Sequence, residues 1–168
     1  MTASFSKKLF VLLLAPAFLF AFTTKTYRSN FSGTWKLNES KSDLGPMAQF
    51  ATRAIKTDQK DDAISISRTA PGFDGGDETT SETLSFDGKE IESTVLGNNK
   101  RKASAKWSDD GNTLSVKYVL NLDFNGQAFE VKGTETWTLS SDGKTLTVQT
   151  NAASPQGDIT AKAVYDKQ

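Results

Sequence analysis

From Thr34 onwards, apolar and polar side chains alternate with a period of two along almost every segment of this chain. The clearest run has its apolar side chains at Leu114, Val116, Tyr118, Leu120 and Leu122. Such alternation turns one face of a strand towards a core and the other towards water, whereas a helix needs apolar residues at helical spacing. Thr, Val and Ile, which favour half-buried strands, are abundant in the same segments. The sequence therefore predicts an all-β domain.

Short turn sequences separate the alternating runs. Asp-Gly pairs occur at Asp87-Gly88, Asp110-Gly111 and Asp142-Gly143, and this pair favours hairpins because glycine tolerates the positive φ that tight turns need. We expect strands at residues 33–38, 52–59, 63–69, 78–86, 90–96, 100–107, 113–122, 128–140, 145–151 and 159–166. Successive hairpins give an up-and-down antiparallel meander, and closure of the meander removes its edges. The predicted fold is a single antiparallel β-barrel of eight to ten strands.

One segment after the first strand departs from this alternation. Pro46 is followed by Met47, Phe50 and Ala51 at helical spacing, and proline fits the first turn of a helix. We therefore expect a short helical turn over residues 46–51 that passes into the next strand. In a barrel this turn lies across one mouth, as either a plug or a lid.

The N-terminal segment has the pattern of an export signal. Lys7 and Lys8 precede an apolar run over residues 9–22, which is shorter than the roughly 20 residues of a membrane-spanning helix. We expect a cleaved signal peptide at residues 1–24 and one barrel domain at residues 25–168. An uncleaved N-terminal anchor is the alternative. The remaining 144 residues suit one domain with one core.

Composition narrows the compartment and the partners. The chain has no cysteine, so it can form no disulfide, it cannot be a lipoprotein, and a bacterial source is favoured. We expect a secreted or periplasmic protein. Without residues 1–24 the chain keeps 18 basic and 20 acidic residues, a formal charge of −2. This balance gives no electrostatic basis for binding nucleic acid, and none for stable membrane association after signal cleavage. We expect a monomer.

Several kinds of chemistry are excluded by missing residue types. The chain has neither histidine nor cysteine, which removes the Ser-His-Asp triad, the cysteine nucleophile and the usual zinc sites. It also has no glycine-rich phosphate loop and no calcium-loop spacing. Glu82 and Glu135 could form a glycosidase pair, but pairing with arginine explains them better. We predict no catalytic residue, no metal and no cofactor, and therefore a protein that is not an enzyme.

Some charged residues fall on the apolar side of their strands when the alternation is extended. Together with two tyrosines on the same faces they form the candidate ligand-binding set: Arg68, Glu82, Arg101, Tyr118, Glu135 and Tyr165. A charge inside a barrel is costly unless it is paired or solvated. Three interpretations are open. The charges pair with each other or lie near the mouths, they line a wet pocket that orients a ligand, or a bulge turns them outward.

The two ends of the predicted domain resemble the calycin superfamily. The opening strand reads Gly33-Thr34-Trp35-Lys36-Leu37, and the last strand contains Ala163-Val164-Tyr165. The pattern is similar to fatty-acid-binding proteins and bacterial lipocalin-like secreted proteins, and Gly-x-Trp is also similar to the start of avidin-type barrels. The resemblance implies a barrel around a pocket for a small apolar or amphipathic molecule. It also places Gly33 and Trp35 at the barrel base.

The last strand departs from the pattern of intracellular lipid-binding proteins. Those proteins usually carry an arginine two residues before the tyrosine, where this chain has Ala163, so a fatty acid cannot be assumed. Lipocalins often place a basic residue over the first-strand tryptophan, and Lys162 is the nearby candidate for that role. If the interior is a site, Arg68 and Arg101 are the expected anchors for an amphipathic acid or a polar-headed lipid.

Two functions from different classes therefore remain. The first is a carrier that binds a small ligand inside the barrel. The second is a structural or protein-interaction module of inhibitor type, whose interior is filled by side chains, as in many small barrels. An internal cavity above about 300 Å³ distinguishes the first from the second.

Overall fold

The computed structural model describes residues 27–72, 75–95, 97–124 and 126–168, and the predicted signal peptide lies outside them. The described residues form the following strands: β1 (Gly33–Leu37), β2 (Ala54–Gln59), β3 (Ala63–Pro71), β4 (Asp77–Ser85), β5 (Ile91–Val95), β6 (Asn99–Trp107), β7 (Thr113–Phe124), β8 (Gln127–Leu139), β9 (Thr145–Ser154) and β10 (Gly157–Lys167). Each predicted strand is present, and most bounds differ by only one or two residues. The all-β class is confirmed.

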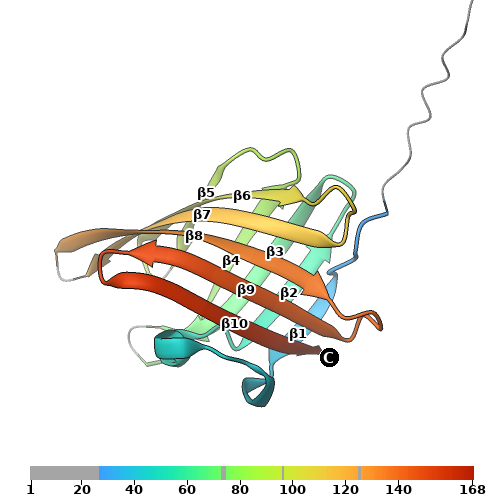
Figure 1. Cartoon of the computed structure of the whole chain (residues 1–168). Coiled ribbons are helices and arrows are strands. Elements are labelled where there is room, and N and C mark those ends of the chain that lie inside the picture. Colours follow the sequence, from blue (N-terminus) through green and yellow to red (C-terminus); the bar gives the residue numbers. More distant parts are fainter. Residues whose placement is uncertain (1–26, 73–74, 96, 125) are drawn as a thin grey trace, which may run out of the picture.

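The strands form one antiparallel sheet that curls into a nearly closed barrel (Figure 1). Strands that are adjacent in sequence pair with each other except β4 and β5, and β1 pairs with both β2 and β10. Trp35 thus lies between Ile55 on one side and Lys167 on the other. The two ends of the domain meet at this seam. The predicted up-and-down antiparallel barrel is confirmed.

Closure is incomplete at one place. The sheet order begins at β4 and ends at β5, so within the described residues no backbone ladder joins these two strands. The Asp87-Gly88 turn between them does form, with Gly88 at φ 80°, but the strands that it connects separate. Our expectation that closure removes every edge is therefore wrong here. β4 and β5 remain edges, and side chains bridge the gap between them.

Three Asp-Gly turns share one hydrogen-bonding pattern. In each, the aspartate accepts from a serine hydroxyl two residues before it and from the backbone N–H two residues after it. For Asp142 the donors are Ser140 Oγ at 2.6 Å and Lys144 N at 3.0 Å. The glycine that follows has a positive φ, 67° at Gly143. These exposed turns fix where each strand ends.

Two short 3-10 helices lie between β1 and β2: η1 (Glu39–Lys41) and η2 (Gly45–Phe50). The predicted helical turn over 46–51 corresponds to η2, which contacts β3 and β10 at one mouth of the barrel. The helices found in the described part of the chain are too short and too polar to cross a membrane.

Large side chains fill the opposite end of the barrel, which we call the closed end. Phe31, Trp35 and Trp137 are fully buried there. The Phe31 ring stacks on Trp107 at 5.5 Å and meets the edge of Trp137 at 6.0 Å. Trp35 Nε1 donates to the Phe31 carbonyl at 3.0 Å and to Thr57 Oγ1 at 3.3 Å. Trp35 is thus buried and hydrogen-bonded within the closed end.

The close approach of Lys167 explains why residue 33, next to Trp35, is a glycine. Its φ is 150°, and a Cβ at this position would lie 3.0 Å from Lys167 Cε. The Lys167 ammonium sits 5.2 Å from the centre of a Trp35 ring, within cation–π range. The basic residue over the first-strand tryptophan is therefore Lys167, and our assignment of Lys162 to that role is wrong. Lys162 is exposed, and its backbone pairs with Asp43 instead.

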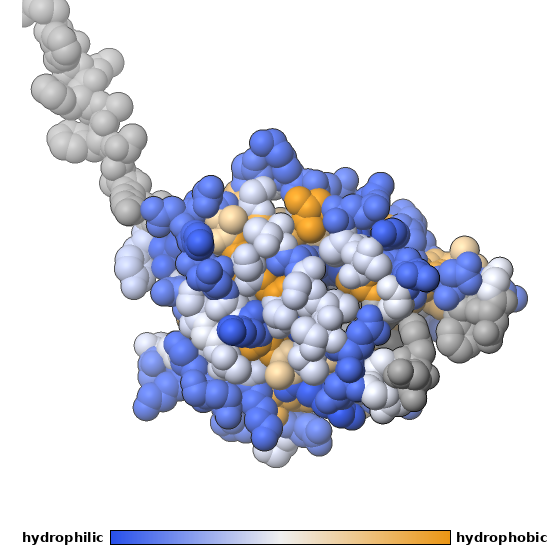
Figure 2. Space-filling model, turned by 180° about the vertical axis from the view of Figure 1, so that it is seen from behind, coloured by the Kyte–Doolittle hydropathy of each residue, from blue (hydrophilic) through white to orange (hydrophobic). Residues whose placement is uncertain are grey.

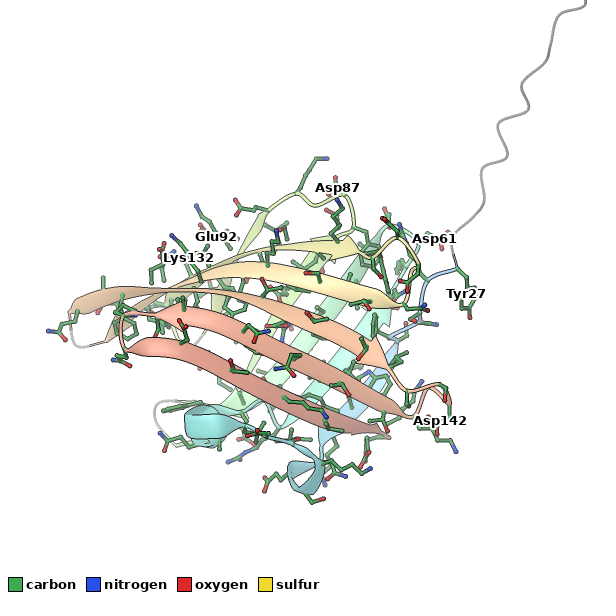
Figure 3. The ribbon with its side chains drawn as sticks, viewed as in Figure 1. Tyr27, Asp61, Asp87, Glu92, Lys132 and Asp142 are labelled. Carbon is green, nitrogen blue, oxygen red and sulfur yellow. The ribbon has the colours of Figure 1, made fainter. Side chains whose placement is uncertain are left out.

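The outer surface is polar, as the alternation requires. Hydrophilic side chains cover most of the face in Figure 2, with apolar groups in small separate spots. In Figure 3, Asp61, Asp87, Glu92, Lys132 and Asp142 point away from the barrel. Apolar side chains are thus turned towards the interior, where the candidate site lies.

Candidate ligand-binding site

The half of the barrel next to η2, which we call the mouth end, is hollow. It contains a cavity of about 500 Å³. Its walls are mainly apolar and come from inward positions on β7 to β10, including Leu120, Leu122, Phe129, Val131, Val148 and Ile159. Small residues at Ala161 and Ala163 leave space on β10. The volume exceeds the value of about 300 Å³ that separates a ligand pocket from a filled interior.

At the inner end of this cavity, four charged side chains form a closed ion-pair ring. The ring consists of Arg68 on β3, Glu82 on β4, Arg101 on β6 and Glu135 on β8. Arg68 donates to Glu82 and, at 2.8 Å, to Glu135. Arg101 donates to both Glu82 oxygens at 2.5 Å and to Glu135 at 2.9 Å. Each arginine therefore bonds both glutamates, and each glutamate bonds both arginines.

The ring is buried, and aromatic side chains cover its charged groups. Exposure of the four side chains ranges from 4% to 16%. Trp137 Nε1 donates to Glu135 at 2.9 Å. The guanidinium of Arg68 lies 5.5 Å from a Trp137 ring centre, and that of Arg101 lies 4.7 Å from the Tyr118 ring centre. Mutual pairing and these contacts offset the cost of burying four charges.

Two members of the ring, Arg68 and Glu135, keep their charges at neutral pH. Burial alone would raise the pKa of Glu135, but Arg68 and Arg101 outweigh it and hold that pKa below its usual range. Burial also opposes the charge on Arg68, yet Glu135 and Glu82 raise its pKa above the ordinary arginine value. A carboxyl with a lowered pKa is a poor proton donor at neutral pH. Glu135 is therefore unsuited to the acid role of a glycosidase pair.

Two tyrosines add hydroxyl groups beside the ring. Burial and, after it, the charge of Glu135 raise the pKa of Tyr118 to about 12, and burial raises the pKa of Tyr165 as well. Both are therefore neutral hydroxyls at physiological pH. Tyr165 donates to the Thr52 carbonyl at 3.1 Å. The Tyr118 hydroxyl has no hydrogen-bond partner within the described residues.

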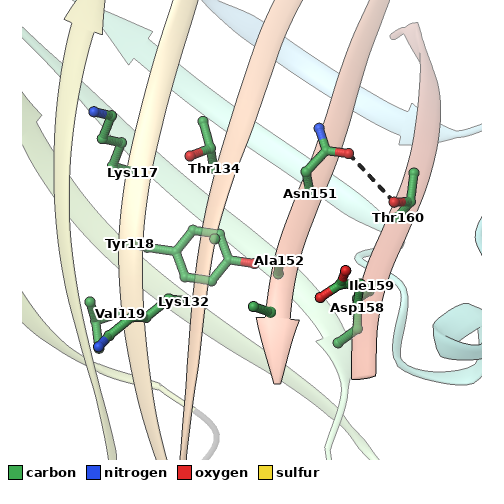
Figure 4. Close-up of a pocket in the computed structure, with 12 residues that line it drawn as sticks. Lys117, Tyr118, Val119, Lys132, Thr134, Asn151, Ala152, Asp158, Ile159 and Thr160 are labelled. Carbon is green, nitrogen blue, oxygen red and sulfur yellow. Dashed lines mark hydrogen bonds between the residues drawn. The ribbon is translucent and has the colours of Figure 1, made fainter. Parts of the chain in front are cut away.

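Tyr118 lies flat against the wall because its partner on β8 is a glycine. Figure 4 shows its ring extending from β7 across β8 towards Ala152 on β9. A Cβ at Gly133 would be only 2.5 Å from the Tyr118 Cζ and hydroxyl oxygen. Gly133 thus makes room for the Tyr118 aromatic ring, which in turn covers the space that the missing side chain of Gly133 leaves.

A second opening reaches the ring through the gap between β4 and β5. A space of about 290 Å³ lies there, and it shares Arg68, Tyr118 and Glu135 with the main cavity. Near the mouth, Gly97 N donates to Glu78 Oε1 at 2.9 Å across this gap. Deeper in, the Arg101–Glu82 pair joins β6 to β4. Side chains thus hold the barrel together where its backbone ladder is missing.

The predicted residues converge as follows. All four charged residues face inward, so the interpretation that a bulge turns them outward is wrong. The pairing interpretation is correct, and Arg68 and Glu135 of the ring also line the cavity. Tyr118 and Tyr165 join it, while a ligand-binding role for the set stays a prediction. Sequence reasoning missed two residues: Trp137, which donates a hydrogen bond to the ion-pair ring, and Gly133, whose missing side chain leaves space for Tyr118. A glycine inside a strand is a known sign of such close approach.

Comparisons with known proteins add little to this picture. No protein-family model and no curated protein matches the chain. Among solved structures, the chain is similar to zebrafish ileal bile acid-binding protein complexed with cholic acid. The identity is 16%, the TM-score is 0.49, and the match covers 82% of this chain and 98% of the other. The strand order and the closing seam described above define an up-and-down antiparallel β-barrel.

Proposed function

We propose that this protein is an exported carrier that binds a small apolar or amphipathic molecule inside its barrel. The observation that carries the proposal is the cavity of about 500 Å³, which has apolar walls and a polar inner end. Mostly apolar cavities with a few convergent polar groups are the usual sites for small ligands. The ion-pair ring and the two tyrosine hydroxyls supply the polar end, and no chemical step is involved.

Export is supported by the sequence pattern alone. Lys7 and Lys8, followed by the apolar run over residues 9–22, have the organisation of a cleaved signal. The mature chain is then a secreted or periplasmic protein, and we expect it to be a monomer. Because it has no cysteine, it cannot carry the lipid anchor of a lipoprotein. Mass measurement of the exported protein tests this. Loss of about the first 20 to 25 residues is expected, and an intact N-terminus contradicts it.

The alternative, a filled interaction module, is less well supported. Such a module needs side chains throughout the interior, and here only the closed end is packed in that way. The connected apolar cavity at the mouth end counts against it.

Binding inside the barrel can be tested with one substitution at two places. Ala161→Trp puts a large side chain into the cavity from β10. Ala153→Trp is the matched control, because Ala153 is exposed on the neighbouring strand β9. We expect the first variant to abolish the fluorescence gain of Nile red and the second to leave it unchanged. Equal binding by both variants would contradict a site inside the barrel.

Native mass spectrometry of protein purified from its own host then asks what the cavity carries. A co-purifying molecule that is present in the Ala153→Trp protein and missing from the Ala161→Trp protein would be the bound ligand.

A further inference from the structure

The ion-pair ring is neutral and complete. It contains two positive and two negative groups, and each of the four bonds both partners of opposite sign. The faces of both guanidiniums are occupied too, by Trp137 and Tyr118. The arginines therefore have their charge matched before any ligand arrives.

The rest of the cavity offers no compensating positive charge. Among the described residues that line it, the charged ones are Arg68, Glu135 and Asp123. Arg68 is already paired with Glu135, and Asp123 at the mouth adds a negative charge. A carboxylate placed in this cavity would have to displace Glu82 or Glu135 from an arginine, which leaves a buried carboxylate without its partner.

Neutral hydrogen-bonding groups, in contrast, are available. The Tyr118 hydroxyl can donate and accept, since none of the described residues bonds it. The Tyr165 hydroxyl donates to Thr52 and keeps its oxygen free to accept. Thr52 and Thr150 also line the cavity. Such groups match an alcohol or a carbonyl.

We propose, building on the carrier function above, that the cavity selects uncharged amphipathic molecules and discriminates against carboxylates. The hydroxyl or carbonyl head lies at Tyr118 and Tyr165 beside the ring, and the apolar tail extends towards the mouth. This assignment replaces the amphipathic acid that unpaired Arg68 and Arg101 would have favoured.

Decanol and decanoate form a matched pair of probes, because they share a tail and differ in the charge of the head. Each is titrated against Nile red bound to the full mature protein at about pH 8, where decanoate is ionised. We expect decanol to bind more tightly by at least about tenfold, since decanoate must bring an unpaired charge into the barrel. Equal binding, or tighter binding of decanoate, overturns the proposal.

Charge variants of the ring test the cause. Glu135→Gln leaves the ring with one excess positive charge, so the preference should move towards decanoate by about tenfold. Glu82→Gln should have the same effect and serves if the first variant does not fold. Glu130→Gln is the control, because Glu130 lies on the outer face of the same strand and is 48% exposed. An unchanged preference in both ring variants, or an equal change in Glu130→Gln, contradicts the proposal.

Failure of this inference can be distinguished from failure of the carrier function. If decanoate competes as well as decanol, and Ala161→Trp still blocks Nile red, the cavity is a ligand site with a different head-group preference. If neither probe competes and Ala161→Trp has no effect on Nile red, both proposals are wrong.

Discussion

The two ends of this barrel are made by the same strands and differ in the size of their inward side chains. Along β8, the inward positions run from Trp137 at the closed end through Glu135 to Gly133, and then to Val131 and Phe129 at the mouth end. The closed end is packed with aromatic rings, whereas the mouth end encloses a cavity of about 500 Å³. The ladder between β7 and β8 continues through both ends.

The difference shows that the size of the inward side chains determines which end of this barrel contains a cavity. β10 places Tyr165 near the ring and then has Ala163 and Ala161 on the same face, where larger residues would fill the space. The ion-pair ring lies at the boundary between the two ends. Stability is therefore expected to reside in the closed end and the ring, and binding in the mouth end, which gives four ways to test the division.

The largest effect is expected from removing an aromatic ring at each end. Phe31→Ala leaves a void among Trp107 and Trp137 and should cost about 4 kcal/mol in free energy of unfolding. Phe129→Ala only enlarges an existing cavity and should cost about 1 kcal/mol. Urea denaturation measures both. Nile red affinity should fall for Phe129→Ala and stay unchanged for Phe31→Ala. Similar destabilisation at the two sites would contradict the division into two ends.

The second effect is the loss of stability when one charge is removed from the ion-pair ring. Arg101→Met leaves three charges with a net negative value in a buried site and should cost about 3 kcal/mol. Adding Glu135→Leu restores neutrality and should recover part of this loss. Arg53→Met is the control, because the Arg53–Asp77 pair is exposed and should contribute less than about 1 kcal/mol. A loss for Arg101→Met as small as that of the control would show that the ring is not structural.

Much of the fold is predictable from sequence because strand alternation and turns are local properties. The two-residue alternation and the Asp-Gly turns place nearly every strand. The turn at Asp142 is closed by hydrogen bonds from Ser140 and Lys144 to the aspartate. The missing ladder between β4 and β5 was not predictable. A hairpin sequence at Asp87-Gly88 says that the chain turns there, but not that the flanking strands stay within hydrogen-bonding distance.

For the ion-pair ring, the inward-facing residues were predictable and their geometry was not. Alternation alone puts Arg68, Glu82, Arg101 and Glu135 on the inner face. Their closure into a neutral ring depends on the spacing of β3, β4, β6 and β8 around the barrel, which no local pattern encodes. The same applies to Lys167, which reaches Trp35 because β1 pairs with β10.

The third effect should appear in binding more than in stability. Gly133→Ala places a Cβ against the Tyr118 ring, so the ring must rotate into the cavity. Because the mouth end has space, the expected cost is about 1 kcal/mol, at the low end of overpacking effects. Nile red affinity should fall clearly, since the cavity shrinks and the Tyr118 hydroxyl moves. Thr134→Ala, on the outer face of the same strand, should alter neither. A large loss of stability without loss of binding would place Tyr118 in the packed part of the barrel.

The smallest effect is a change in how stability depends on acid. The folded pKa of Glu135 is lowered, so its contribution is present above the unfolded carboxyl pKa of about 4.5 and is lost as the pH falls through the folded value. The free energy of unfolding should therefore decrease between about pH 6 and pH 3, and less steeply in Glu135→Gln. Hydrogen bonds from Ser140 and Lys144 lower the pKa of Asp142 too, but this turn is exposed, so Asp142→Asn should change the slope less. Urea denaturation across this pH range compares the two. A larger change in slope for Asp142→Asn would mean that the exposed turns, rather than the ring, determine acid sensitivity.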